Sequence, residues 1–157
     1  TINHRKHDFN FYYDMKKVYN HKLKSKTDFK DLISKQPFFG QIQTKGGKNN
    51  TSNLSNDLKV NPNLVEVPKD YPNNDVFKNV VAQHYDAIRM DDSLIGEVLM
   101  GLRKAGLEKN TIIVYFSDHG ANNLLRHKEM TTEVGLKGPF AILSPKDYIP
   151  RNNIRND

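Results

Sequence analysis

The sequence predicts an α/β fold, with a mixed and mostly parallel sheet flanked by helices. Apolar residues recur at helical spacing from about 75 to 105, which indicates one long amphipathic helix. The run TIIVYFS (111–117) is β-branched and aromatic without strict alternation, as in a strand buried on both faces of a parallel sheet. PFAILSP (139–145) is typical of another strand. Strands on either side of a long helix are the order that a crossover connection produces.

The elements before this helix are predicted from shorter signals. Residues 1–24 have weak periodicity and are expected to be irregular. Thr27 can cap a short helix, DFKDLISK (28–35), which Pro37 then ends. PFFGQIQT (37–44) alternates in part and is expected to be a buried strand.

The loop that follows and the helix itself carry further expectations. Residues 45–74 are rich in Gly, Asn, Ser and Pro, and we expect a long surface loop and linker. Gly106 follows the helix as its C-cap. Asp91 falls on the apolar stripe of the helix, so that its carboxylate must find a partner, and a structural role is favoured over catalysis. His84 is expected to be a satisfied core histidine.

Size and composition limit the classes of function. A chain of 157 residues can form one domain with a sizeable core, and we predict a single partial domain over 1–157. It has no cysteine, which excludes disulfides, thiolate catalysis and cysteine-bound zinc in this chain. No apolar run approaches the length of a membrane span. The net charge of +6 fits either a lysine-rich solvated surface or an anionic partner, and no nucleic-acid-binding motif accompanies it.

Asp118 and His119 stand where the strand 111–117 should end, followed by Gly120, which lets the backbone turn sharply. Open α/β sheets bind ligands beyond the carboxyl ends of their strands. A carboxylate suits calcium or magnesium, whereas an imidazole leans toward zinc, manganese or iron. These residues by themselves fit both a metal site and an ordinary turn.

Arg126, His127 and Lys128 form a basic triplet shortly afterwards. An ammonium group can neutralise a developing oxyanion, and an imidazole can donate a proton to a leaving oxygen. A solvated basic turn is the other interpretation of the same residues.

Several motifs in a fixed order resemble the type I sulfatases of the alkaline-phosphatase superfamily. They are QPFFGQIQT, the Val-Pro-x-x-x-Pro linker in VEVPKDYPNND, the Tyr-Asp-x-Ile helix, GLEKNTIIVYFSDHG and the final RHKEMTTEVGLKGPFAILSP. The resemblance covers about residues 36–145, whereas 1–35 match only loosely. It implies hydrolysis of a sulfate ester, with a sulfated carbohydrate as partner.

The resemblance also assigns roles to single residues. Asp118 and His119 fall on metal ligands, for which the family's usual ion is calcium, and many members have Asn at the position of His119. Lys128 falls on the basic residue that contacts the sulfate near its bridging oxygen, and Arg126 and His127 flank it, within reach of substrate. Lys48 takes the place of a family His that binds sulfate or protonates the leaving group. An ammonium group gives up its proton less readily than an imidazolium near neutral pH.

One part of the family's machinery is missing from these residues. Type I sulfatases use a formylglycine made from the Cys or Ser of Cys/Ser-x-Pro-x-Arg, after a strand with a pair of Asp metal ligands, and neither motif occurs here. We therefore expect the later part of a sulfatase catalytic domain, inactive alone, in a periplasmic or extracellular protein. Two other hypotheses are a truncated or degenerate paralogue that binds anionic glycans, and a phosphoester or phosphonate hydrolase of the same superfamily. The sequence specifies neither the sugar nor the oligomeric state.

Overall fold

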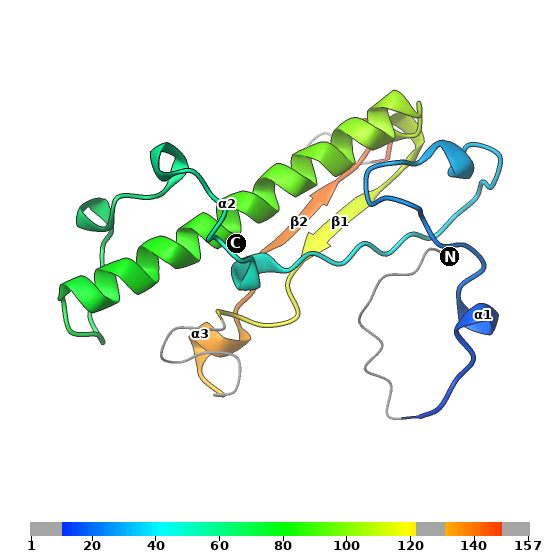
Figure 1. Ribbon diagram of the computed structural model, residues 1–157. Coiled ribbons are helices and arrows are strands. Elements are labelled where there is room, and N and C mark those ends of the chain that lie inside the picture. Colours follow the sequence, from blue (N-terminus) through cyan, green and yellow to red (C-terminus); the bar gives the residue numbers. More distant parts are fainter. Residues whose placement is uncertain (1–10, 122–130, 149–157) are drawn as a thin grey trace. The chain divides into compact units, whose positions relative to one another are not determined.

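The computed structural model describes residues 11–121 and 131–148 (Figure 1). The chain divides into two compact units. The first takes in the described residues up to Thr44, Leu94–Ile112 and those from Ser144 onward. The second takes in Lys45–Ser93 and the described part of Ile113–Leu143. Lys48, Asp118 and His119 all belong to the second unit, and the single partial domain over 1–157 stays a prediction.

Helix α2 runs from Asp75 to Lys104 and confirms the long helix expected from the apolar periodicity (Figure 1). Its N-terminus is capped by Asn74, whose side-chain oxygen accepts a hydrogen bond from the Phe77 amide at 3.1 Å. The buried residues of the helix recur at helical spacing: Val81, Ala82, Asp86, Ala87, Asp91 and Leu102.

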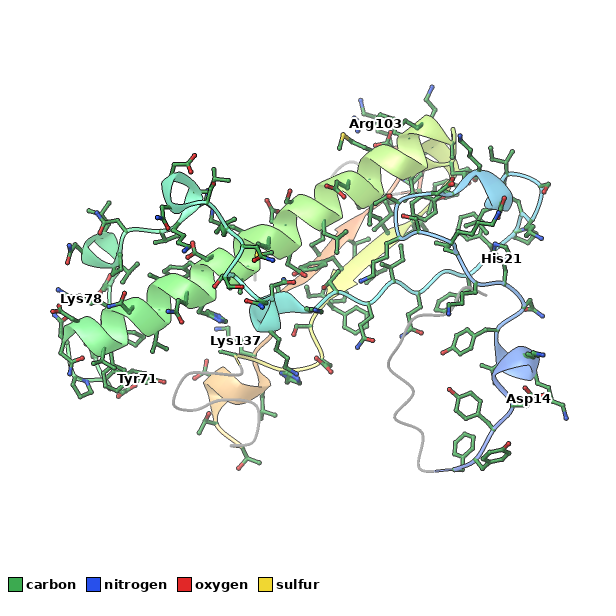
Figure 2. The ribbon with its side chains drawn as sticks, viewed as in Figure 1. Asp14, His21, Tyr71, Lys78, Arg103 and Lys137 are labelled. Atoms are coloured by element: carbon green, nitrogen blue, oxygen red, sulfur yellow. The ribbon has the colours of Figure 1, made fainter. Side chains whose placement is uncertain are left out.

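The C-terminus of α2 ends in the glycine cap that the sequence predicts. Gly106 has a φ of +72°, where a side chain would be strained. Its amide bonds the Arg103 carbonyl and the Leu107 amide bonds the Leu102 carbonyl, both at 3.0 Å, which is the Schellman pattern. Arg103, labelled in Figure 2, donates two hydrogen bonds of 2.7 and 2.8 Å to the Glu108 carboxylate just beyond the cap.

Two strands lie within the runs predicted to contain them, and they pair with each other. Strand β1 (Ile113–Phe116) pairs with β2 (Phe140–Leu143) in antiparallel register, with Ile113 opposite Leu143 and Phe116 opposite Phe140. The mostly parallel sheet is therefore not confirmed, because the described residues form this antiparallel pair and no other sheet.

The expectation that the strand 111–117 is buried on both faces is wrong for the described structure. Residues of β1 alternate between half-buried and exposed, and those of β2 are exposed throughout. An apolar run predicts burial only if other elements cover it. The exposed fractions of Val114, Phe116 and Phe140 are 48%, 64% and 67%, so these side chains are left largely uncovered.

Two further predictions, for segments that lie in the first unit, are also wrong. The helix expected over 28–35 is a single 3₁₀ turn, Lys30–Leu32, whose N-cap is Phe29 and not Thr27. The Asp28 carboxylate accepts from the Lys30 amide at 3.2 Å, a local bond that competes with helix formation. The strand expected over 37–44 is reduced to an isolated bridge residue, Gly40, because no described strand pairs with it.

The remaining elements are short. Helices α1 (Met15–Val18) and α3 (Glu133–Leu136) each have four residues. The long loop and linker contains three 3₁₀ turns, Gly46–Lys48, Asn56–Leu58 and Pro62–Leu64, and is otherwise irregular as expected. In the described ranges, no helix has both the length and the apolar character needed to cross a membrane.

Candidate metal and sulfate site

The segment Ser117–Gly120 leaves β1 and is held by backbone hydrogen bonds at both ends. The Ser117 amide donates to the Pro139 carbonyl at 3.2 Å, just before β2, and the Gly120 amide donates to the Gly135 carbonyl at 2.8 Å, within α3. The Ser117 hydroxyl also lies 2.6 Å from the His119 carbonyl. Asp118 and His119 therefore stand on backbone that is fixed on both sides, at the end of a strand as predicted.

Asp118 and His119 are brought together by this turn. The Nε2 atom of His119 lies 3.4 Å from Oδ1 of Asp118, and the two side chains are 24% and 54% exposed. The other ring nitrogen of His119, Nδ1, lies 2.8 Å from the Gly120 carbonyl oxygen. A carbonyl oxygen can only accept, so Nδ1 carries the proton, and in the neutral imidazole Nε2 is left with its lone pair.

This arrangement fits a bound cation. An imidazole lone pair and a carboxylate oxygen that face each other are two acceptors, and a proton or a metal ion between them removes their repulsion. Metal-ligating histidines commonly donate their other ring N–H to a backbone carbonyl, as His119 does. Among the residues that the structure describes, no third acidic or histidine side chain completes a metal-binding group. Asp118 and His119 could therefore supply two ligands of a larger set.

Lys48 lies on a tight turn, residues 46–49, which we call the Lys48 turn. The carboxylate of Asp91 on α2 accepts hydrogen bonds from the Gly46 amide at 3.1 Å and from the Asn49 side chain at 3.3 Å. The Asn49 amide group also bonds the Gly46 carbonyl at 2.9 Å and the Ala87 carbonyl at 3.0 Å. The Lys48 side chain itself is exposed. The expectation that Asp91 is buried and finds a partner is confirmed.

His84 departs from its expected role. Its Nδ1 atom is buried and has no hydrogen-bond partner in the described structure, so the expected satisfied ring is wrong. Burial lowers the pKa of His84, because the charged imidazolium loses more solvation than the neutral ring. The ring lies directly against Gly47, where an added Cβ would come within 2.6 Å of Cε1.

Tyr115 connects β1 to the same region of α2. Burial, and then the charges of Asp91 and Asp92, raise the pKa of its phenol, because ionisation there would be both desolvated and opposed by like charge. The charge of Asp91 therefore acts on Tyr115, which lies on the strand that leads to Asp118. Asp91 in turn anchors the Lys48 turn.

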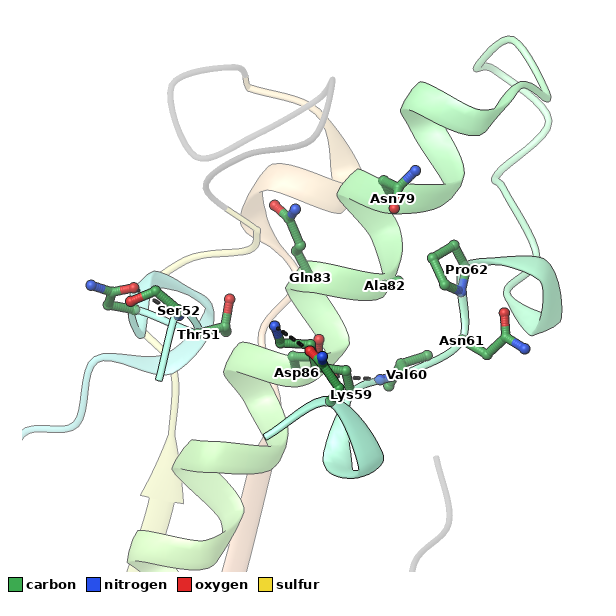
Figure 3. Close-up of a pocket in the computed structure, with 12 residues that line it drawn as sticks. Thr51, Ser52, Lys59, Val60, Asn61, Pro62, Asn79, Ala82, Gln83 and Asp86 are labelled. Carbon is green, nitrogen blue, oxygen red and sulfur yellow. Dashed lines mark hydrogen bonds between the residues drawn. The ribbon is translucent and has the colours of Figure 1, made fainter. Parts of the chain in front are cut away.

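A hollow of the second unit lies elsewhere on α2 and was not predicted from the sequence. It has a volume of about 660 Å³ and lies between the loop 50–62 and one side of the helix (Figure 3). In it, Asp86 accepts a hydrogen bond from the Val60 amide at 2.8 Å. Its lining is mostly amide and hydroxyl side chains and includes neither Lys48 nor the Asp118–His119 pair. It is therefore not the candidate catalytic site.

Arg126, His127 and Lys128 lie outside the described residues. Their predicted roles in substrate binding and proton transfer stay predictions. The candidate site residues that the structure describes are Asp118 and His119, which lie together, and Lys48 on its turn against α2.

An acid and a histidine fixed at the end of a strand are a ligand pair that metal-dependent α/β enzymes can use. The sequence profile of the sulfatase family matches residues 3–156, and the chain belongs to this family. The match includes residues 3–35, where the sequence resembles the family's motifs only loosely.

Individual relatives agree with this assignment. The chain is 36% identical over 92 residues to an ulvan-active sulfatase from Formosa agariphila, a match that covers 59% of this chain and 14% of that protein. It is 42% identical over 44 residues to arylsulfatase K from Bos taurus, and equally to that from Canis lupus familiaris, covering 28% of this chain and 8% of each relative. The chain thus spans a small part of these curated relatives. No solved structure gave a match.

Proposed function

We propose that this chain is part of a sulfatase that hydrolyses the sulfate esters of a glycan, in which a hydroxyl of a hydrated formylglycine outside the chain attacks the sulfur and displaces the ester oxygen. The observation that carries the proposal is the Asp118–His119 pair, in which Nε2 of His119 lies 3.4 Å from Oδ1 of Asp118 just after a strand, in a chain of the sulfatase family. The net charge of +6 and a relative named for activity on ulvan support an anionic glycan as substrate.

The proposed roles of the residues follow from their chemistry. Asp118 and His119 hold a divalent cation, most simply Ca²⁺, which when bound neutralises charge on the sulfate oxygens. Lys48 and Lys128 place ammonium groups against the same oxygens, where negative charge is offset most strongly in a site that excludes water. Arg126 supports binding of the sulfate.

Bond cleavage requires a proton for the departing alcohol. His127 is proposed to donate it to the bridging oxygen as the sulfur–oxygen bond breaks, so that the sugar leaves as a neutral alcohol. Lys48 occupies the position of the family's other candidate donor, and an ammonium group there serves better to bind sulfate than to release a proton. We propose that the intact protein works in the periplasm or outside the cell.

The test is an assay of the intact protein that contains this chain. Sulfate release from a sulfated oligosaccharide and from an aryl sulfate should exceed phosphate release from the matching aryl phosphate, and a chelator should abolish it. A preference for the phosphate ester would instead support a phosphoester hydrolase. Glycan binding without turnover would support the degenerate paralogue, for which Lys48 in place of His is the favouring feature.

A further inference from the structure

The Lys48 turn is held at both ends by one carboxylate oxygen. Oδ1 of Asp91 accepts from the Gly46 amide at the start of the turn and from the Asn49 side chain at its end, at 3.1 and 3.3 Å. Asp91 is only 3% exposed. An ionised carboxylate is costly to bury unless hydrogen bonds compensate for the lost water, and these donors provide such compensation. Loss of Asp91 would therefore remove the bond at the start of the turn and weaken its end, where Asn49 would keep its bond to the Ala87 carbonyl.

The middle of the turn is fixed by a close approach to the helix. Gly47 lies over the ring of His84, so that an added Cβ would come within 2.6 Å of Cε1 and 2.8 Å of Nδ1. Gly46 adopts a φ of +54°, which other residues rarely tolerate. A segment crowded with glycine and asparagine would otherwise sample many conformations. In this structure the backbone of the Lys48 turn is held against α2, and the Lys48 side chain extends from this turn.

We infer that Asp91 is the positioning residue for Lys48: its buried carboxylate fixes the turn that places the Lys48 ammonium group against the sulfate. This inference rests on the proposed role of Lys48 in sulfate binding. A cation that stabilises a transition state must be placed to within a fraction of an ångström, and a displacement of about 1 Å can cost about a hundredfold in rate. Lysine is the side chain that most needs a fixed base, because its stem is long and flexible.

Asp91 interacts with both segments that carry described candidate residues. After burial itself, its charge is the next largest cause of the raised pKa of Tyr115 on β1, the strand that leads to Asp118. The carboxylate whose charge acts on that strand is also bonded to the turn that carries Lys48. A change at Asp91 should alter sulfate binding through Lys48 without removing any group that contacts substrate.

The test is a set of double-mutant cycles in the intact enzyme. We would measure kcat and KM on a sulfate ester for Asp91→Ala, Lys48→Ala and the double variant. Asp86→Ala is the matched control, because Asp86 is an equally buried aspartate of α2 that also accepts from a loop amide, that of Val60. Asp86→Ala would be combined with Lys48→Ala in the same way.

We expect Asp91→Ala to lower kcat/KM by about tenfold when Lys48 is present and by less than about twofold when it is absent. Asp86→Ala should change kcat/KM by the same factor in both backgrounds. An equal effect of Asp91→Ala in both backgrounds would overturn the inference and leave the role of Lys48 standing. An unchanged kcat/KM in Lys48→Ala would remove the proposed role of Lys48, and the inference with it.

A second variant tests the positioning of Lys48 if Asp91→Ala does not fold. Asn49→Ala removes one of the two hydrogen-bond donors to the Asp91 carboxylate and keeps the bond from the Gly46 amide. It should lower kcat/KM several-fold with Lys48 present and not with Lys48→Ala. Asn50→Ala is its control, since the Asn50 side chain is bonded to the Ser52 amide at 3.0 Å and not to α2. Equal losses in Asn49→Ala and Asn50→Ala would contradict the positioning role.

Discussion

The Nε2 atom of His119 lies 3.4 Å from Oδ1 of Asp118, while Nδ1 of the same ring lies 2.8 Å from the Gly120 carbonyl oxygen. The carbonyl fixes a proton on Nδ1, so the neutral form of the ring presents a lone pair to the carboxylate. Two acceptors at this separation repel each other unless a cation or a proton is shared between them. The local backbone thus favours one tautomer of the neutral ring and holds the two proposed ligand atoms close together.

The first prediction concerns these two ligands in the intact enzyme. Asp118→Ala should lower metal-dependent sulfate release by more than about a hundredfold, because it removes a charged ligand. His119→Asn should keep more activity than His119→Ala, since an amide oxygen can replace the imidazole as a ligand for Ca²⁺. Calcium binding measured by calorimetry should fall in the same order. Unchanged binding and activity in Asp118→Ala would remove Asp118 from the site, with Asp57→Ala in the exposed loop as the control.

The second prediction concerns Lys128. Replacing it with Ala should lower kcat/KM by about a hundredfold to a thousandfold, the range found when one group that stabilises an oxyanion is removed. Lys128→Arg should restore part of the rate, because it keeps the charge but changes the geometry. The thermal unfolding midpoint should stay the same in both variants. Activity equal to that of the unmodified enzyme in Lys128→Ala would refute the role.

A third prediction uses the proposal that Lys48 stands in place of a histidine of the sulfatase family. Lys48→His should remain active, and its rate should acquire a new dependence on pH around 6 to 7, where an imidazole titrates. Lys48→Met keeps the length of the side chain without its charge and should bind sulfate more weakly. The pH profile of kcat/KM for the three proteins provides the measurement. Identical profiles for Lys48→His and the unmodified enzyme would show that position 48 does not contact the reacting group.

The sequence predicted α2 and its cap well because both depend on local signals. Apolar spacing over 30 residues and a glycine after the last turn leave few other structures possible. The place of Asp118 and His119 after a predicted strand indicated that they could act as a pair of ligands. In the structure their side chains lie close together, and their role as ligands stays a prediction.

The elements that depend on distant partners could not be predicted in the same way. The run 37–44 has a strand's composition, but a strand needs a neighbour, and none pairs with it in the described structure. The periodicity of the helix showed that Asp91 needs a partner. It could not show that Gly46 and Asn49, in a loop without any pattern, would provide the donors. The unpartnered nitrogen of His84 likewise depends on the packing of Gly47, which no local signal indicates.

A fourth prediction compares two glycines of α2. A Cβ at Gly101 would meet the carbonyl oxygen of Thr27 and lie 3.1 Å from the Phe29 ring, whereas one at Gly96 would meet nothing within 4 Å. Gly96→Ala should therefore raise the free energy of unfolding by about 0.5–1 kcal/mol through helix propensity. Gly101→Ala should lower it by about 1–3 kcal/mol, because overpacking outweighs the same gain. Denaturant titrations would measure both, and a stabilised Gly101→Ala would contradict this packing.

The last prediction concerns the pH dependence of stability that His84 introduces. Burial places the pKa of His84 below its ordinary value of about 6.5, so the unfolded chain binds this proton more readily than the folded one. Above about pH 7.5, His84 should then make no pH-dependent contribution to the free energy of unfolding. It should fall as the pH drops through about 6.5, until the folded form is protonated as well.

The variant that isolates this effect is His84→Gln, which cannot titrate in this range. Its loss of stability between pH 7 and pH 5 should be smaller than that of the unmodified protein, because the remaining groups still titrate and His84 does not. Thermal or denaturant unfolding at several pH values gives the difference between the two curves. Parallel curves would mean that the His84 ring gains a compensating partner on protonation. Its buried Nδ1, which has no acceptor in the described structure, argues for diverging curves.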